Sequence, residues 1–314
     1  MVWVALTCPQ CSAPLPRVAI WRAVKCAACG SLITRTEEVV KRDAFRQALN
    51  RAQLCTGVAA GSEVLCGGER FVLLQTLGRG SASEVHLARR VGPLPQLVTM
   101  KLSIHPADED SLKREAQNLR ALHEVDGSAG VYAAQRLPEV IACSMLEDGS
   151  GRFALVLRHP NGFWGSLAAM GLRFPQGIDP RHAVWIWRRM LDVLHFIHAQ
   201  GWAHGSISPE HALVHPQDHG VRLIGWAEAR KNATPQAKAA DLMRAARVVQ
   251  VLLSGMSNAN VLPAQVPPVL ASLIALAAKD EAFCIAQGGS GIDSQLVSVA
   301  REAFGPPVFV PLVL

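Results

Sequence analysis

The chain has 314 residues, of which 50% are hydrophobic and 18% are charged, so it is long enough to bury a substantial core. This composition excludes a disordered chain and a collagen-like repeat. The formal net charge is +6, and residues 1–60 alone carry +5, from eight Lys or Arg and three Asp or Glu. The longest apolar stretch, residues 269–278, is too short for a bilayer span, so no transmembrane helix is expected. Because the first residues lack a basic leader, a cytoplasmic location is expected.

Four cysteines near the N-terminus form two CxxC pairs, Cys8 with Cys11 and Cys26 with Cys29. Each CxxC turn directs two thiolates at one point, and two such turns complete the tetrahedral sulfur shell that zinc prefers. We therefore expect a structural four-cysteine zinc ribbon over residues 1–35, in which the ion supplies the folding energy that so short a segment lacks. A dithiol redox site and structural disulfides are the alternatives, and a reducing compartment disfavours both.

Residues 36–53 place apolar side chains at helical spacing among charged ones, which predicts an amphipathic connecting helix. Glycines between residues 57 and 68 then interrupt the pattern, so residues 36–68 are expected to be a connecting helix and a linker. The other cysteines have no ligand spacing and are expected to be buried small apolar side chains, although the first two could approach each other. They are Cys55, Cys66, Cys143 and Cys284.

A glycine-bearing turn follows, between two segments of strand composition at residues 71–74 and 86–88. The turn contains Gly78 and Gly80 and leads to Val85. Lys101 ends a further strand-like segment, residues 97–101, sixteen residues after Val85, and Glu115 lies fourteen residues further on in a helical pattern. One GxG motif is weak, but the ordered set of glycine turn, strand lysine and helix glutamate is specific.

This ordered set resembles the protein kinase family, and the resemblance covers roughly residues 69–280. In that family the glycine-rich hairpin covers the nucleotide phosphates, and a strand lysine, oriented by a helix glutamate, contacts them. The resemblance therefore implies nucleotide contacts for the five residues of the set, Gly78, Gly80, Val85, Lys101 and Glu115. A purely structural ion pair between Lys101 and Glu115 is the alternative.

The resemblance also implies an α+β fold with two lobes. A small, β-rich N-lobe is expected over residues 69–160, and a mainly helical C-lobe with a truncated activation segment over residues 161–314. Residues 152–157 are predicted as the strand that enters the hinge at residues 158–162. Further helices are predicted over residues 179–200, 237–253, 268–278 and 294–304.

Residues 204–214 align without a gap to the family's catalytic loop, His-Arg-Asp-Leu-Lys-Pro-Glu-Asn, and the short strand after it. Ser206 stands where the family has the aspartate that accepts the substrate proton, and Ser208 where it has a lysine. His211 replaces the metal-binding asparagine, and Gly225 replaces the metal-binding aspartate, so both protein ligands for magnesium are missing. No catalytic residue is therefore expected, and the pattern is typical of a pseudokinase.

Positions that the family uses for packing survive. His204 matches the loop histidine, Trp226 the aromatic residue after the metal aspartate, and Leu119 the helix residue one turn after Glu115. Asp241 matches the buried aspartate that anchors the loop backbone in the family. Val85, Thr99 and Leu213 would line an adenine slot, and Thr99 is larger than the alanine that is usual there. Binding of ATP or ADP without required magnesium is therefore left open.

We thus expect a catalytically impaired, kinase-like module that acts as a regulatory or scaffolding protein. One alternative is an atypical active kinase or nucleotidyl transferase in which Glu210, His211 or Glu228 substitutes for the lost groups. The other is a zinc-ribbon nucleic-acid-binding protein, which the basic N-terminal segment suggests. Proteins are the expected partners, a nucleotide is a candidate ligand, nucleic acid ranks below both, and no membrane partner is expected.

Two features remain outside this scheme. The tail at residues 308–314 is apolar for a chain end, so it is expected to dock on a partner or on its own lobe. Five histidines gather between residues 195 and 219, but their spacing matches no metal site. They are expected to be solvated or hydrogen-bonded: His195, His198, His211, His215 and His219.

Overall fold

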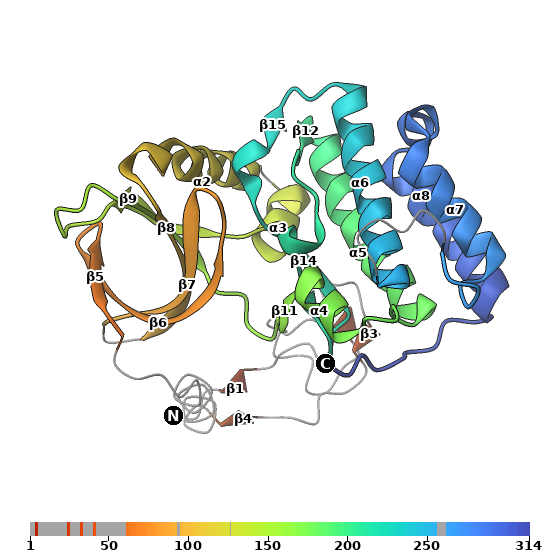
Figure 1. Cartoon of the computed structure of the whole chain (residues 1–314), viewed down its shortest axis with the longest axis horizontal. Helices are drawn as coiled ribbons and strands as arrows, with labels where there is room; N and C mark the ends of the chain where they lie inside the picture. Colours follow the sequence, from red (N-terminus) through yellow and green to blue (C-terminus); the bar gives the residue numbers. More distant parts are fainter. Residues whose placement is uncertain are drawn as a thin grey trace. The chain divides into compact units, whose positions relative to one another are not determined.

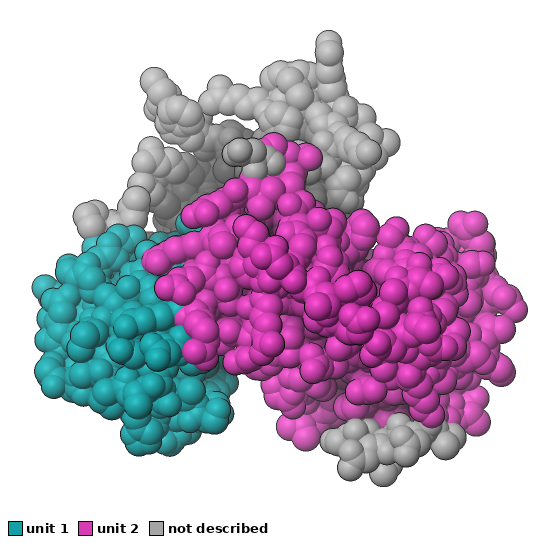
Figure 2. All heavy atoms as spheres, turned by 90° about the horizontal axis from the view of Figure 1, so that it is seen from above, with its two compact units in different colours: residues 1–113, 139–159 teal, residues 114–138, 160–314 magenta. Residues whose placement is uncertain are grey.

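The computed structural model describes residues 61–92, 95–125, 127–255 and 262–314, together with four two-residue strands nearer the N-terminus. The chain divides into two compact units, which Figure 2 colours separately. Unit 1 comprises Met1–Lys113 and Glu139–His159, and unit 2 comprises Arg114–Pro138 and Pro160–Leu314. Residues 114–138 thus belong to unit 2, although they fall in the range expected for the N-lobe. The four-part division of the chain stays a prediction.

The four short strands pair antiparallel, β1 (Val4–Ala5) with β4 (Val40–Lys41) and β2 (Val24–Lys25) with β3 (Leu32–Ile33). Strand β4 lies inside the range predicted as a helix, so that prediction is wrong at Val40 and Lys41. The backbone groups of these two residues pair with β1, which is distant in sequence. The spacing of apolar residues within one segment cannot predict such a long-range partner. The four CxxC cysteines of the expected zinc ribbon lie outside the described residues.

Unit 1 contains an antiparallel sheet with the strand order β5-β6-β7-β8-β10-β9 (Figure 1). The sheet curls so far that its two edge strands meet. A bridge joins Cys66 to Leu146, and the backbone N–H of Glu147 donates to the carbonyl of Leu65 at 3.0 Å. The strands are β5 (Glu63–Cys66), β6 (Glu69–Arg79), β7 (Ser83–Arg90), β8 (Gln96–Ser103), β9 (Val140–Met145) and β10 (Phe153–Arg158).

The predicted strand segments between residues 71 and 157 lie in this sheet to within one residue, but β5 lies in the range expected to be linker. The alternation of side chains along β8 separates the two faces of the sheet. Val98, Met100 and Leu102 are 0 to 2% exposed and belong to one apolar cluster, which also includes Phe71 of β6. Thr99 and Lys101 therefore lie on the opposite face of the same strand.

Unit 2 is mainly helical (Figure 1). Helix α5 (Pro180–Ala199) matches the prediction, with an Asp179 side chain as N-cap and proline in the first turn. The helices of unit 2 are the C-terminal part of α2 (Glu109–His123), α3 (Gly127–Arg136), α4 (Leu167–Arg173), α5, α6 (Pro235–Ser254), α7 (Pro268–Lys279) and α8 (Glu281–Phe304).

Helix α8 is much longer than the predicted segment at residues 294–304. Its first half carries several glycines, which lower helix propensity and hide the periodic pattern. One of them, Gly288, departs from helical geometry with a φ of 59°, so α8 bends there. Packing against α5, α6 and α7 supplies the stability that propensity does not.

Two small sheets hold the loop of interest. Strands β11 (Gly165–Ser166), β13 (Ala212–His215) and β14 (Gly220–Leu223) form one, and β12 (Trp202–Ala203) with β15 (Arg230–Lys231) forms the other. Residues 204–211 run between β12 and β13, so both ends of this loop are fixed by strand pairing. The end of the loop is the 3-10 helix η3 (Pro209–His211).

The C-terminal tail, residues 305–314, packs on unit 2. The ring of Phe309 stacks on that of His219 with centroids 4.3 Å apart, and the His219 ring also stacks on Trp185 at 4.3 Å. Leu312 is only 7% exposed. The tail therefore docks on its own unit, which is one of the two expected arrangements.

Cys66 and Cys284 are buried, as predicted, and Cys143 is half-buried; Cys55 lies outside the described residues. Burial raises the pKa of the Cys66 thiol and raises that of Cys284 to about 11, so both remain protonated near neutral pH. Within the described parts of the chain, no helix combines the length and the apolar character needed to cross a membrane.

Candidate functional site

Three of the expected nucleotide-binding residues lie side by side in unit 1. Gly78 on β6 pairs with Val85 on β7, and Val85 pairs in turn with Lys101 on β8. The turn between β6 and β7 is closed by the backbone N–H of Gly80, which donates to the carbonyl of Ser83 at 2.8 Å. Lys101 is 9% exposed, so its side chain is largely covered by neighbouring residues.

A polar pair that sequence reasoning missed lies on the same face as Lys101. Thr99 is two residues before Lys101 on β8, and its hydroxyl lies 3.0 Å from Nδ1 of His159, the residue after β10. Thr99 is also the register partner of Leu87 and Leu157 on the two neighbouring strands. His159 falls in the range expected to be the hinge, but its contact with Thr99 was not predicted because the two residues are 60 positions apart and no motif links them.

Glu115 and Asn118 lie on the part of α2 that belongs to unit 2. The Glu115 carboxylate, 3% exposed, accepts the backbone N–H of Trp226 at 3.3 Å. The Asn118 side-chain amide donates to the carbonyls of Trp226 and Ala229, at 2.9 and 3.0 Å. Lys101 belongs to unit 1, so its expected ion pair with Glu115 stays a prediction.

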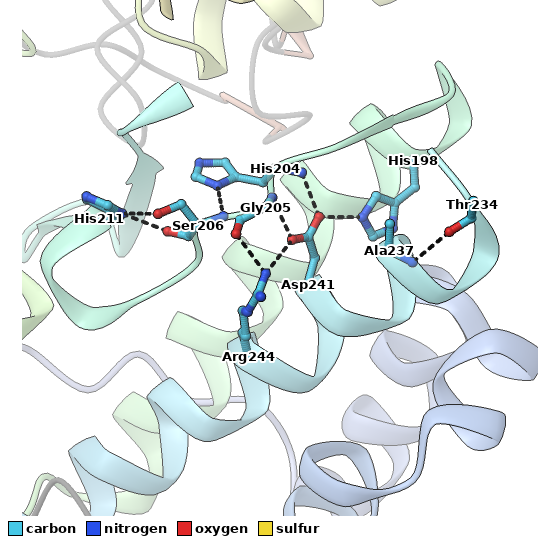
Figure 3. Close-up of polar contacts among 9 residues, drawn as sticks. All are labelled: His198, His204, Gly205, Ser206, His211, Thr234, Ala237, Asp241 and Arg244. Carbon is cyan, nitrogen blue, oxygen red and sulfur yellow. Dashed lines mark hydrogen bonds and ion pairs between the residues drawn. The ribbon is translucent and has the colours of Figure 1, made fainter. Parts of the chain in front are cut away.

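Asp241 anchors the loop backbone, as the resemblance predicts (Figure 3). Its carboxylate is 0% exposed and accepts the backbone N–H groups of His204 and Gly205, at 2.6 and 2.9 Å. The Nε2 atom of His198 lies 3.2 Å from the same carboxylate. Arg244 adds a hydrogen bond from its guanidinium to the carbonyl of Gly205 at 2.8 Å.

The His204 ring is 0% exposed and packs against the indole of Trp226, with ring centroids 4.4 Å apart. Burial in this setting lowers the pKa of His204 to about 4, because the charged imidazolium cannot be solvated there. The ring is therefore neutral near neutral pH. Its Nδ1 atom accepts the backbone N–H of Ser206 at 3.2 Å, so this side chain supports the loop.

Ser206 and His211 are in contact, but not as a nucleophile and its base (Figure 3). His211 Nδ1 lies 2.7 Å from the carbonyl oxygen of Ser206 and 3.0 Å from its hydroxyl oxygen. A carbonyl oxygen only accepts, so Nδ1 carries the proton and cannot remove the hydroxyl proton of Ser206. Glu210 and Glu228 are both solvent-exposed.

The two positions that bind magnesium in protein kinases do not fit that ion here. Magnesium prefers oxygen ligands, whereas these positions hold the imidazole of His211 and the hydrogen side chain of Gly225. Gly225 has a φ of 80°, and a Cβ atom on it would lie 2.9 to 3.0 Å from the His211 ring. Among the described residues, no group of three or more His, Cys, Asp or Glu side chains is placed to hold a metal ion.

Ser208, the remaining substituted position, precedes η3 and makes no side-chain capping hydrogen bond. It lies two residues from Ser206 on the same loop, and the loop thus brings together Ser206, Ser208 and His211, with Gly225 against the His211 ring. The site contains hydroxyls and an imidazole, and it contains no carboxylate at the substituted positions.

Comparison with known proteins places this geometry in a fold class. No family model matches the chain, and no curated protein matches it. Solved structures do match: a mutant of the kinase domain of Mycobacterium tuberculosis PknI has a TM-score of 0.55 and 16% sequence identity. A second mutant of the same domain has a TM-score of 0.54 and the same identity; each match covers 78% of this chain and 99% of the other.

The chain therefore has a protein-kinase-like fold, with a curled β-sheet in unit 1 and a helical unit 2. This confirms the α+β class and the kinase-like architecture that the motifs predicted. At 16% identity the likeness extends to the fold and not to an activity.

Proposed function

We propose that the chain is a pseudokinase, a catalytically impaired kinase-like module that serves as a regulatory or scaffolding protein. The single observation that carries this proposal is the replacement of the catalytic carboxylate by Ser206, next to a His211 ring that is protonated on the nitrogen facing it. Phosphoryl transfer depends on positioning and on charge neutralisation, so loss of the base and of both magnesium ligands costs many orders of magnitude in rate.

The contrast between kept and lost residues supports a structural role for the loop. Asp241 and His204 are 0% exposed and bind the backbone of the loop, and the equally buried Trp226 packs on the His204 ring. The substituted positions are those that carry the chemistry in kinases. A chain under selection only for folding and binding would retain the first set and lose the second. The module then acts through the surfaces it presents to a protein partner.

A nucleotide is a candidate ligand of this module. The β6–β7 hairpin offers backbone N–H groups, and Lys101 offers one positive charge, so phosphates could be held without a metal ion. The Thr99 side chain fills space on the same strand face as Lys101, and its hydroxyl already contacts His159. Both features argue against adenine binding there. Binding of ATP or ADP without magnesium is therefore part of the proposal only as a secondary property.

The N-terminal cysteines add a zinc-binding element to the proposal. The second CxxC pair, Cys26 and Cys29, lies in sequence between the paired strands β2 and β3, as expected for a knuckle at the end of a hairpin. Four thiolates and one zinc ion together contribute −2, which reduces the basic excess of the N-terminal segment. A moderately basic element suits an acidic protein surface, so we favour a protein partner over nucleic acid.

The decisive experiment is a phosphotransfer and nucleotidyl-transfer assay on the full chain, with labelled ATP and magnesium or manganese. We expect no transfer to the chain itself or to generic protein substrates. Label transfer that Lys101→Ala abolishes would establish an atypical enzyme and end the pseudokinase proposal. A parallel thermal-shift measurement with ADP, in the presence and absence of EDTA, tests nucleotide binding, and the absence of a shift in both buffers would exclude it.

A further inference from the structure

Residues 225–234 connect the β14 region to helix α6, and we call them the closing segment. They correspond to the stretch that the kinase resemblance identifies as a truncated activation segment. Within the segment, η4 (Trp226–Glu228) and β15 follow one another without a long irregular stretch. Thr234 ends the segment as the N-cap of α6, and its hydroxyl accepts the backbone N–H of Ala237 at 3.2 Å.

Helix α2 holds one side of the closing segment. Glu115 binds the backbone N–H of Trp226, and the Asn118 amide bridges the carbonyls of Trp226 and Ala229. The Trp226 side chain is 0% exposed, and its indole N–H donates to the carbonyl of Leu223 at 3.0 Å. Release of the segment from α2 would break the three hydrogen bonds that Glu115 and Asn118 make to its backbone, and breaking hydrogen bonds to buried groups is costly.

Strand β12 and the loop that follows it hold the other side. Arg230 and Lys231 of β15 pair with β12, and the backbone N–H of Ala233 donates to the carbonyl of Gly201 at 2.9 Å. At Gly205 the loop and the closing segment approach so closely that a Cβ atom would lie 2.6 Å from the carbonyl oxygen of Glu228. Only glycine fits there, although the family pattern has an arginine at this position.

Gly225 provides a second contact of the same kind. A Cβ atom at this residue would lie 2.9 Å from Cδ2 and 3.0 Å from Nε2 of His211. The His211 ring is held from its far edge by the carbonyl and hydroxyl oxygens of Ser206, so it is not free to swing away. The substituted residues Ser206, His211 and Gly225 therefore pack against one another, and the position of each depends on the next.

We propose that the closing segment is permanently closed on the loop at residues 204–211, and that Gly205 and Gly225 are the residues that permit closure. The closed path is incompatible with the side chains that kinases place at these two positions. The closing segment then has a single closed conformation and no open state. The consequence for regulation rests on the proposed function. A scaffolding module with this segment would present the same surface to its partner at all times, because the segment would not change conformation.

The matched pair Gly205→Ala and Gly201→Ala tests the close approach at Glu228. Both glycines have nearly the same backbone conformation, with φ of 80° and 81°, so both variants carry the same strain. Only at Gly205 does the added Cβ meet a neighbour, since nothing lies within 4 Å at Gly201. We expect Gly205→Ala to lower Tm by at least about 4 °C more than Gly201→Ala does.

Hydrogen exchange followed by mass spectrometry on the full chain gives the local readout. Wild-type amides at residues 226–233 should be protected, and saturating ADP should not change their exchange. Gly205→Ala and Asn118→Ala should raise exchange there by at least about tenfold, the latter without any added backbone strain. Exchange of the wild-type segment at the rate of an unstructured peptide would overturn the inference, as would equal effects of the two glycine variants.

The contact between Gly225 and His211 is tested by a double-mutant cycle. Gly225→Ala alone should accelerate exchange in the closing segment, and combining it with His211→Ala should reduce that increase to the part caused by backbone strain, since the ring that blocks the methyl group is gone. Additive effects would contradict this packing. Phosphotransfer by the wild-type protein would end the proposed function but would leave these exchange results unaffected, so the two failures are distinguishable.

Discussion

The buried carboxylate of Asp241 accepts the backbone N–H of His204 at 2.6 Å, across 37 residues of sequence. The same carboxylate accepts the N–H of Gly205 at 2.9 Å, so one side chain fixes the start of the loop. This anchor is present although Ser206 and His211 stand at two positions of the same loop that carry phosphoryl transfer in kinases. Backbone placement and chemistry are therefore separable in this loop.

Replacement of Asp241 by asparagine should destabilise the protein by about 2 to 4 kcal/mol. Asparagine offers one acceptor oxygen, so its amide group would face a backbone N–H that the carboxylate now satisfies. Urea unfolding measures the change. The control is Asp280→Asn, because Asp280 caps α8 through an exposed bond to Phe283 N–H and asparagine caps equally well. Equal losses in the two variants would contradict this account of the anchor.

The neutral, buried His204 predicts a pH dependence of stability. Its pKa is lowered to about 4 in the folded state, against 6.5 for the unperturbed group. Between these values the unfolded chain binds more protons than the folded one, so folding stability falls as pH drops from about 6.5 toward 4. Below pH 4 the free energy of unfolding should be lower by on the order of 3 kcal/mol because of His204 alone.

Urea unfolding at several pH values between 4 and 7 checks this expectation. His204→Phe keeps an aromatic ring beside Trp226 and removes the titration, so its stability should depend less on pH over that range. His105→Gln, a substitution of an exposed histidine, serves as the matched control and should retain the wild-type slope. An unchanged slope in His204→Phe would refute the assignment.

Prediction from the sequence succeeded where a short motif sets the register. The loop at 204–214 contains His204, Pro209 and Leu213 at family spacing, and this was enough to place Asp241 against the loop backbone. The glycine hairpin and the strand with Lys101 were located in the same way. In these cases neighbouring residues along the chain carry the information.

Contacts between residues distant in sequence were not predictable in this way. Asn118 meets Trp226 across 108 residues, and Thr99 meets His159 across 60, with no motif linking either pair. The need for glycine at 205 follows only from the position of the Glu228 carbonyl, which sequence does not reveal. The strand β5 was missed because four residues among glycines carry too little pattern.

Thr99 should limit nucleotide binding through its size and its contact with His159. Thr99→Ala is expected to increase the affinity for ADP in EDTA buffer about tenfold. At high ADP concentration this gain adds about 1.4 kcal/mol to the stabilisation by the ligand, and a larger thermal shift measures it. Thr99→Val keeps the volume and removes only the hydroxyl, so it should not reproduce the gain if size is the cause. A gain in Thr99→Val and none in Thr99→Ala would contradict the steric explanation.

The four N-terminal cysteines should hold about one zinc ion per chain. Metal analysis of the purified protein and release into a colorimetric chelator after thiol modification measure the content. Cys8→Ser or Cys29→Ser should remove the bound zinc, whereas Cys143→Ser, at a half-buried position in the β-sheet of unit 1, should leave the content unchanged. Zinc-free protein from a reducing preparation would contradict the ribbon and favour a dithiol site.

The C-terminal tail should stabilise unit 2 through Leu312 and the ring of Phe309. Leu312 is 7% exposed, so Leu312→Ala is expected to cost about 2 kcal/mol of unfolding free energy. Phe309→Ala removes the stacking contact with His219 and should cost about 0.5 to 1.5 kcal/mol, because Phe309 remains 58% exposed.

Val313→Ala is the matched control within the tail, since Val313 is 79% exposed and its truncation should change stability by less than about 0.5 kcal/mol. Urea unfolding gives all three values. Because Phe309 and Leu312 contact the same unit that they stabilise, their effects should not depend on protein concentration. Concentration-dependent unfolding, or a Leu312→Ala loss no larger than that of Val313→Ala, would show that the tail instead docks on a second chain.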